Sequence, residues 1–148
     1  MKADNYIKIE FPSRSVNEGF ARAAAAAFAA QLDPTMEELG DIKTAVSEAV
    51  TNCIVHAYPD ELGKITMRLR ILAGGELEIS IKDTGRGIED VARAREPLFT
   101  TGGEERSGMG FTIMESFMDK LRVRSKPSKG TTVTMTRAIA RRGAQAHD

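Results

Sequence analysis

The stretch Glu48-Ala49-Val50-Thr51-Asn52 decides how this chain folds and where its chemistry lies. It belongs to an apolar stripe of helical spacing, from Leu39 to about His56, which predicts an amphipathic helix. Glu48 and Asn52 are one helical turn apart, so their side chains project from the same side of that helix. Taken alone, such a pair is most simply solvent-facing, because exposed polar pairs are the usual content of a helix surface.

Three further stretches follow in chain order, and each combines polar groups with glycine. The alternation of apolar residues before Asp83 predicts that its carboxylate points inward, where it needs a hydrogen-bonding partner. The glycines that follow let the backbone pass close to a ligand. The second glycine pair precedes Phe111 and a helical run, so its amides are expected at a helix N-terminus, where phosphate binding is favoured. The stretches are Asp83-Thr84-Gly85-Arg86-Gly87-Ile88, Ser107-Gly108-Met109-Gly110 and Gly130-Thr131-Thr132.

Each stretch also has a simpler interpretation. An Asp-Thr-Gly sequence can merely cap a strand, a lone Gly-x-Gly is commonly a loop, and Gly130-Thr131-Thr132 fits a hairpin turn. The ordered set, however, predicts a single site for magnesium and ATP. There Asp83 can accept a hydrogen bond from the adenine amine, and Asn52 can supply an oxygen to Mg²⁺. Glu48 is placed to orient or deprotonate an attacking hydroxyl.

Periodicity predicts the remaining elements. Two capping boxes, Ser15 with Glu18 and Thr35 with Glu38, mark the N-termini of two helices. In the first of these helices the apolar face is expected to include Phe20. In the first strand, Ile7, Ile9 and Phe11 alternate with polar residues and are expected to form one buried face. The expected strands span 7–11, 65–71, 77–83, 121–125 and 131–137, and the expected helices span 16–31, 36–56 and 111–119.

This order of elements predicts one domain over residues 1–139, followed by a flexible tail at 140–148. The expected fold class is an α/β two-layer sandwich, with a mixed, mostly antiparallel sheet and helices on one face. Residues 85–110 form a long stretch rich in glycine, threonine and charge, with a short helical candidate at 89–95. Long loops in small domains are commonly functional, so we expect a lid over bound nucleotide.

Composition excludes several classes of function. The 148 residues carry 21 basic and 21 acidic side chains, so no net charge attracts nucleic acid or an anionic membrane. No secretion signal or membrane span is evident, which predicts a soluble cytoplasmic protein. The sequence contains no P-loop. His56 and His147 are too few for a metal site, and the single cysteine, Cys53, is expected to lie in the core.

The four stretches resemble the N, G1, G2 and G3 boxes of the GHKL superfamily of ATPases and kinases. Within it, the segments 32–36, 46–52, 97–101 and 105–115 are similar to the anti-sigma-F factors of sporulation. The resemblance covers nearly the whole chain. It implies the Bergerat α/β sandwich fold, with ATP or ADP and Mg²⁺ as ligands.

The resemblance also implies roles for individual residues. Asn52 would bind the metal, Asp83 the adenine, and Glu48 would be the catalytic base. Arg106 would touch the terminal phosphate, although by itself it could equally be a solvated lid residue. The other implied nucleotide-binding residues are Gly85, Gly87, Ile88, Thr100, Thr101, Ser107, Gly108, Met109, Gly110, Phe111 and Thr132.

Proteins of this kind are homodimers that hold a sporulation sigma factor F inactive and phosphorylate a serine of an anti-anti-sigma factor. The resemblance therefore implies both partners here, with no direct contact to nucleic acid or membrane. Arg14, Glu18 and Arg22 on the first helix would contact partners, or they form only a charged face. A stress-response anti-sigma kinase, or a non-catalytic module that binds nucleotide to tune an interface, remains an alternative.

Overall fold

The computed structural model describes residues 3–96 and 105–139, without the side chains of residues 105–109. A five-stranded sheet lies at its centre, in the order β1-β2-β3-β5-β4, and every neighbouring pair is antiparallel. The described residues thus contain no parallel pair, although the sequence suggested a mixed sheet. The strands are β1 (Ala3–Pro12), β2 (Lys64–Leu72), β3 (Glu76–Asp83), β4 (Lys120–Lys126) and β5 (Gly130–Ala138).

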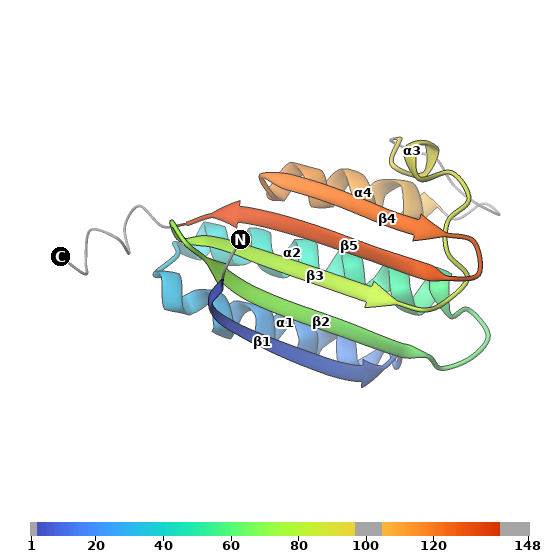
Figure 1. Ribbon diagram of the computed structural model, residues 1–148, viewed down its shortest axis with the longest axis horizontal. Helices are drawn as coiled ribbons and strands as arrows, with labels where there is room; N and C mark the ends of the chain where they lie inside the picture. Colours follow the sequence, from blue (N-terminus) through green and yellow to red (C-terminus); the bar gives the residue numbers. More distant parts are fainter. Residues whose placement is uncertain (1–2, 97–104, 140–148) are drawn as a thin grey trace.

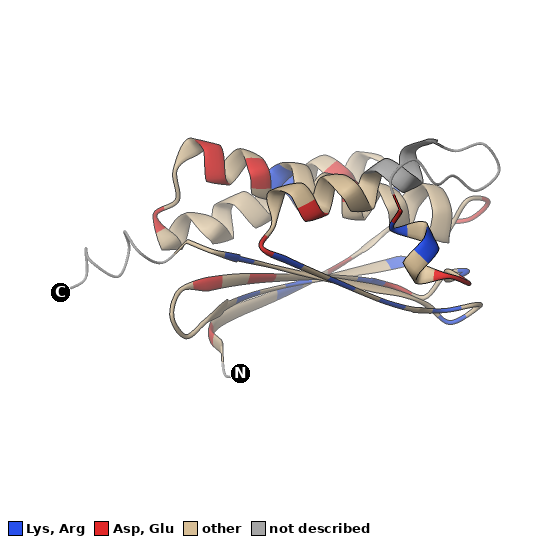
Figure 2. Cartoon of the chain, turned by 90° about the horizontal axis from the view of Figure 1, so that it is seen from above, with Lys and Arg blue, Asp and Glu red and all other residues tan. Residues whose placement is uncertain are grey.

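The three long helices lie together on one face of the sheet, and the other face is left uncovered (Figures 1 and 2). This arrangement confirms the predicted two-layer α/β sandwich. No helix among the described residues is long and apolar enough to cross a membrane. The helices are α1 (Val16–Ala29), η1 (Ala30–Leu32), α2 (Met36–Asn52), η2 (Cys53–Ala57), α3 (Val91–Ala94) and α4 (Glu105–Phe117).

One predicted capping box is present and the other is not. At the start of α2 the Glu38 amide donates to the Thr35 hydroxyl at 3.0 Å, and the Thr35 amide donates to the Glu38 carboxylate at 2.8 Å. Ser15, by contrast, already has helical backbone angles and makes no capping bond. Glu18 instead accepts a hydrogen bond from Ser47 of α2, so its carboxylate serves the contact between helices rather than the helix start.

On two of the predicted apolar faces, fewer side chains are buried than the periodicity suggests. The face of α1 that packs inward carries Ala21, Ala25 and Phe28, whereas Phe20 is 59% exposed. Alanines let α1 approach α2 closely, and this favours a face rotated away from Phe20. On β1, Ile7 is 42% exposed, because β1 is an edge strand.

The core lies between the helical layer and the three central strands. The apolar stripe of α2 buries Ile42, Val46 and Val50 completely, as its spacing predicted. Facing side chains from β2, β3 and β5 are equally buried, among them Ile65, Leu69, Ile79, Ile81 and Met135. Burial of this apolar surface is the main force that fixes α2 on the sheet.

The ends of two helices differ from prediction. α2 continues beyond Asn52 as one wide π-helical segment, η2, before the chain leaves the layer. α4 begins at Glu105 rather than at Phe111, so Met109 and Gly110 lie beyond its first turn. Phe111 is 4% exposed and packs in the core. The free amides expected at the second glycine pair therefore belong to residues nearer Glu105.

Candidate functional site

α2 and α4 meet at the polar pair that the sequence singled out. Glu48 and Asn52 are both half-buried on α2. A Cβ atom built on Gly110 of α4 would lie 3.2 Å from Oδ1 of Asn52 and 3.4 Å from Oε1 of Glu48. Any larger residue at Gly110 would press on both polar groups. The glycine therefore lets α4 reach the side chains that the sequence assigned to metal and base.

Asp83 ends β3 and is 4% exposed, as the alternation predicted. Its Oδ1 accepts hydrogen bonds from the amides of Gly85, at 3.0 Å, and Thr131, at 3.2 Å. Its Oδ2 accepts from the thiol of Cys53, at 3.4 Å. Burial raises the pKa of the Asp83 carboxyl above its ordinary value, and the hydrogen bonds from Gly85, Cys53 and Thr131 oppose that shift.

These contacts join the two halves of the predicted site. Cys53 directly follows Asn52 in the chain, and its thiol touches the carboxylate of Asp83. The metal-binding and adenine-binding candidates therefore lie on the same side of the sheet, within one helical turn of a shared contact. Burial also raises the pKa of Cys53 well above its ordinary value, and the Asp83 carboxylate adds to that shift, so the thiol keeps its proton and acts as a donor.

The turn after Asp83 is fixed by the neighbouring hairpin. Gly87 has a positive φ of 73°, and its backbone lies against Lys126, so a side chain there would be both strained and obstructed. The Ile88 amide donates to the Ser125 hydroxyl at 2.7 Å. The Ser125 hydroxyl also lies 2.8 Å from that of Thr131. The turn after Asp83 is thereby tied to both β4 and β5.

Sequence reasoning missed three members of this network. The Thr131 amide donates to Asp83, because the antiparallel register of β3 and β5 places these two residues opposite each other. The predicted contact of Thr132 with nucleotide stays a prediction. Tyr58 is 7% exposed, and its hydroxyl accepts from the Thr84 amide at 2.7 Å. Cys53 was expected to be core alone. The Thr131 contact depends on the pairing of β3 with β5, which the periodicity of the sequence does not reveal.

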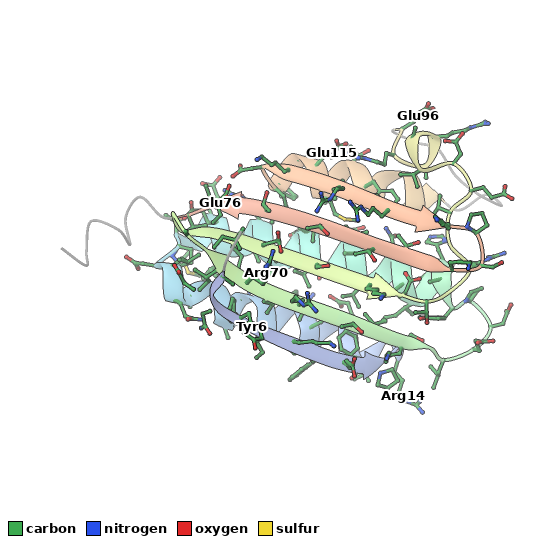
Figure 3. The ribbon with its side chains drawn as sticks, viewed as in Figure 1. Tyr6, Arg14, Arg70, Glu76, Glu96 and Glu115 are labelled. Atoms are coloured by element: carbon green, nitrogen blue, oxygen red, sulfur yellow. The ribbon has the colours of Figure 1, made fainter. Side chains whose placement is uncertain are left out.

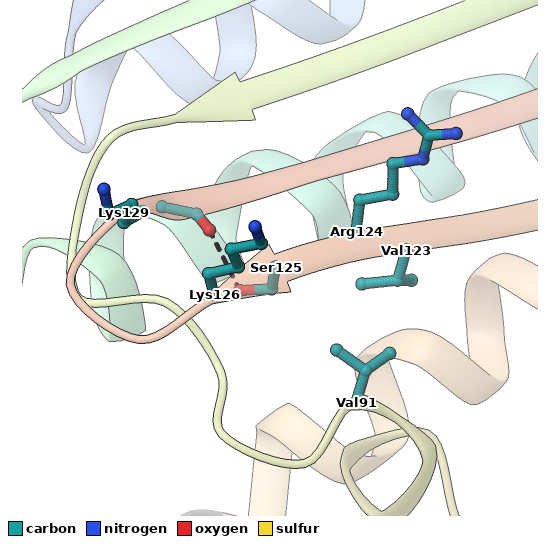
Figure 4. Close-up of a pocket in the computed structure, with 7 residues that line it drawn as sticks. Val91, Val123, Arg124, Ser125, Lys126 and Lys129 are labelled. Atoms are coloured by element: carbon teal, nitrogen blue, oxygen red, sulfur yellow. Dashed lines mark hydrogen bonds between the residues drawn. The ribbon is translucent and has the colours of Figure 1, made fainter.

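A cavity of about 460 Å³ adjoins the site (Figure 4). It lies where α3 faces the turn between β4 and β5. Glu48, Asn52 and Asp83 are not among the residues that line it. Ser125 and Gly130 connect it to the Asp83 network, and the Ser125 hydroxyl donates to the Gly130 carbonyl at 3.0 Å. Its lining is Val91, Val123, Arg124, Ser125, Lys126, Lys129 and Gly130.

Two of the predicted partner residues, Glu18 and Arg22, lie on α1 and contact α2, whereas Arg14 precedes the helix instead of lying on it. Glu18 accepts from the Ser47 hydroxyl at 2.5 Å and forms an ion pair with Arg22 at 3.3 Å. Arg22 also donates to Ser47, at 3.4 Å. This cluster is thus held against α2 next to Glu48. Arg14 is exposed beyond the end of β1 (Figure 3) and lines a second hollow, of about 590 Å³, between α1 and the loop after η2.

Several predicted site residues cannot be placed in this network. Thr100 and Thr101 lie outside the described residues, as does the expected tail at 140–148. The segment 105–109 is helical, but its side chains, including those of Arg106, Ser107 and Met109, are not described. Gly108 belongs to the first turn of α4, where amides lack partners within the helix. Their roles stay predictions.

The donors present fit magnesium only together with a nucleotide. The described residues contain no group of three or more His, Cys, Asp or Glu side chains that could hold a metal alone. Mg²⁺ commonly takes one or two protein oxygens and completes its shell with phosphates and water. Asn52 offers one such oxygen, next to the closely packed Gly110. This donor set fits a metal that arrives with its triphosphate.

Comparison with known proteins identifies the family. Residues 11–137 match the family model described as the histidine kinase-like ATPase domain. An anti-sigma F factor from Caldanaerobacter subterraneus subsp. tengcongensis is 58% identical over 95% of this chain and 99% of its own. An anti-sigma F factor from Clostridium perfringens is 53% identical over 92% of this chain and 98% of its own.

Solved structures show the same fold at low identity. The RsbU and RsbW domains of a Mycobacterium tuberculosis protein match with a TM-score of 0.68 and 21% identity, over 93% of this chain and 33% of theirs. A histidine kinase domain from Erythrobacter litoralis matches with a TM-score of 0.59 and 21% identity, over 88% of this chain and 65% of its own. The chain therefore belongs to the histidine kinase-like ATPase domain family of the GHKL type, and within it to the anti-sigma F factors.

Proposed function

We propose that this protein is an anti-sigma factor that is also a protein-serine kinase using Mg²⁺ and ATP. Family membership supports nucleotide binding, and the names of the relatives support a sigma factor as partner. The observation that carries the proposal is the close approach of Gly110 to Glu48 and Asn52. Asn52 directly precedes Cys53, whose thiol contacts Asp83. That arrangement supports the proposal because the residues proposed as base, metal ligand and adenine acceptor lie on one side of the sheet.

Each residue has a distinct part in the proposed reaction. Asp83 accepts a hydrogen bond from the adenine amine, and Gly85 and Gly87 form the turn beside the base. Asn52 holds Mg²⁺ through its side-chain oxygen. Bound nucleotide supplies the transferable γ-phosphoryl group. Glu48 orients the incoming serine hydroxyl and accepts its proton, which suits a reaction that depends mainly on positioning and charge neutralisation.

The proposed partners are sigma factor F and an anti-anti-sigma factor that receives the phosphoryl group on serine. The protein acts as a homodimer in the cytoplasm, without direct contact to nucleic acid or membrane. Arg14, Glu18 and Arg22 form the contact surface. The support is local geometry, because Ser47 ties Glu18 and Arg22 to α2 directly beside Glu48. A partner that binds there is well placed to affect the catalytic helix.

One experiment tests the enzymatic part. The purified protein is incubated with labelled ATP and candidate anti-anti-sigma proteins, and label on serine is measured. We expect transfer by the wild type, retained ATP binding without transfer for Glu48→Gln, and loss of magnesium-dependent ATP affinity for Asn52→Ala. Glu37→Gln, an exposed change in the first turn of α2, is the matched control and should behave as wild type.

Other outcomes separate the alternatives. Nucleotide-dependent binding of sigma factor without any transfer to serine would favour a non-catalytic binding module. Transfer only to an anti-anti-sigma factor of the stress response would identify the other class of anti-sigma kinase. Full transfer by Glu48→Gln would remove Glu48 from the role of base, and unchanged magnesium-dependent affinity in Asn52→Ala would remove the metal assignment.

A further inference from the structure

The Asp83 carboxylate is held by donors from three different elements, and they divide between its two oxygens. Oδ1 accepts from two backbone amides, those of Gly85 and Thr131. Among the described residues, only the Cys53 thiol donates to Oδ2. Oδ1 is therefore fixed by the main chain, whereas the direction of Oδ2 depends on one side chain.

We infer that Cys53 is a positioning residue for nucleotide recognition, whose thiol orients Oδ2 of Asp83 to accept the amine of adenine. The inference rests on the proposed function and deepens it. A carboxylate oxygen has room for more than one hydrogen bond, so the thiol and an amine can share Oδ2. Both groups are almost fully buried, with Cys53 and Asp83 each 4% exposed, so water competes little for this contact.

The thiol also bears on the choice between bases. Adenine presents an amino donor at the position where guanine presents a carbonyl acceptor, so an ionised, correctly aimed carboxylate attracts the first and repels the second. A hydrogen bond from Cys53 favours the ionised form of Asp83 and limits rotation of its side chain. Without the thiol, Oδ2 would keep its charge in a buried site with no described donor.

The test compares two nucleotides that differ only in the amine. Equilibrium affinities for ATP and for purine riboside 5′-triphosphate, which lacks the 6-amino group, are measured for the whole chain with Mg²⁺ present. The variants are Cys53→Ala, Cys53→Ser and Val50→Ala. Val50 is completely buried one turn earlier on α2, so its truncation controls for lost packing alone. The ratio of the two affinities within one variant is unaffected by partial loss of folded protein.

We expect the wild type to prefer ATP, and Cys53→Ala to lower that preference by about threefold to tenfold, the effect of losing one hydrogen bond. Cys53→Ser should restore it, because a hydroxyl can donate to the same oxygen. Val50→Ala should leave it unchanged. An equal loss of affinity for both nucleotides in Cys53→Ala, or an unchanged preference, would overturn the inference while leaving the proposed function intact. Failure of the wild type to bind ATP would overturn both.

Discussion

Gly110→Ala should separate stability from nucleotide binding. In a helix interior, alanine is more favourable than glycine by about 1 kcal/mol. The new methyl group, however, would lie 3.2 Å from Oδ1 and 3.3 Å from Nδ2 of Asn52, and 3.4 Å from Oε1 of Glu48. The two distances to Asn52 are tighter than ordinary contact, so its amide must move by a few tenths of an ångström, whereas the distance to Glu48 is at the edge of ordinary van der Waals contact.

The expected free energy of unfolding therefore rises by about 0 to 1 kcal/mol, because the gain in helix propensity is partly offset by the contact. If Asn52 holds the metal as proposed, affinity for Mg²⁺-ATP should fall about threefold to tenfold, since a displaced side chain would no longer aim its oxygen at the ion. Urea denaturation measures the first quantity, and equilibrium binding with and without magnesium measures the second.

Gly40→Ala is the matched control. Gly40 lies within α2, and a Cβ atom there meets nothing within 4 Å. This variant should gain about 1 kcal/mol of stability and bind nucleotide as the wild type does. The reasoning would be refuted if Gly110→Ala bound Mg²⁺-ATP with unchanged affinity, because the packing of α4 on Asn52 would then not govern the metal ligand.

Three further changes test the surrounding contacts. Burial raises the pKa of the Asp83 carboxyl in the folded protein above its value of about 3.9 in the unfolded chain, so folding takes up a proton at pH values between the two pKa values. The stability of the wild type relative to Asp83→Asn should therefore fall as pH rises through that range. The pH dependence of the urea midpoints of the two proteins checks this. Arg137→Ala should lower the free energy of unfolding by about 1.5–3 kcal/mol, because Arg137 donates to the half-buried Asp41 carboxylate at 2.7 Å. Thermal unfolding measures this loss, and a loss below about 0.5 kcal/mol would contradict the prediction. Tyr58→Phe should cost about 1–3 kcal/mol by leaving the Thr84 amide without its acceptor, and a urea midpoint equal to that of the wild type would show that water replaces the hydroxyl.

The sequence predicted the elements well where a single face of each element packs against one neighbour. The alternation that ends at Asp83 and the stripe from Ile42 to Val50 are such cases, and both are buried as expected. The helix α1 is different, because its many alanines allow more than one inward face. Periodicity could not tell that Phe20 would lie outside, since the choice depends on how closely α1 approaches α2.

The positions of candidate site residues were predictable where residue type and backbone pattern agree, while their roles stay predictions. Asp83 two residues before Gly85, and Asn52 one turn after Glu48, are of this kind. The contact of Cys53 with Asp83 was not predictable, because a thiol on an apolar stripe is most simply core and only the fold brings Asp83 to it. The start of α4 was also missed, since Gly108 and Gly110 are poor helix formers and local propensity argued against a helix there.

The π-helical segment η2 makes the length of residues 53–57 matter more than their composition. An extra residue in a helical turn shifts everything after it by about 100° around the axis, as follows from 3.6 residues per turn. A single deletion here would straighten the end of α2 and rotate Ala57, whose carbonyl receives the Arg86 amide at 3.3 Å, out of reach. Engineered variants of this protein should therefore tolerate substitutions in the segment far better than indels.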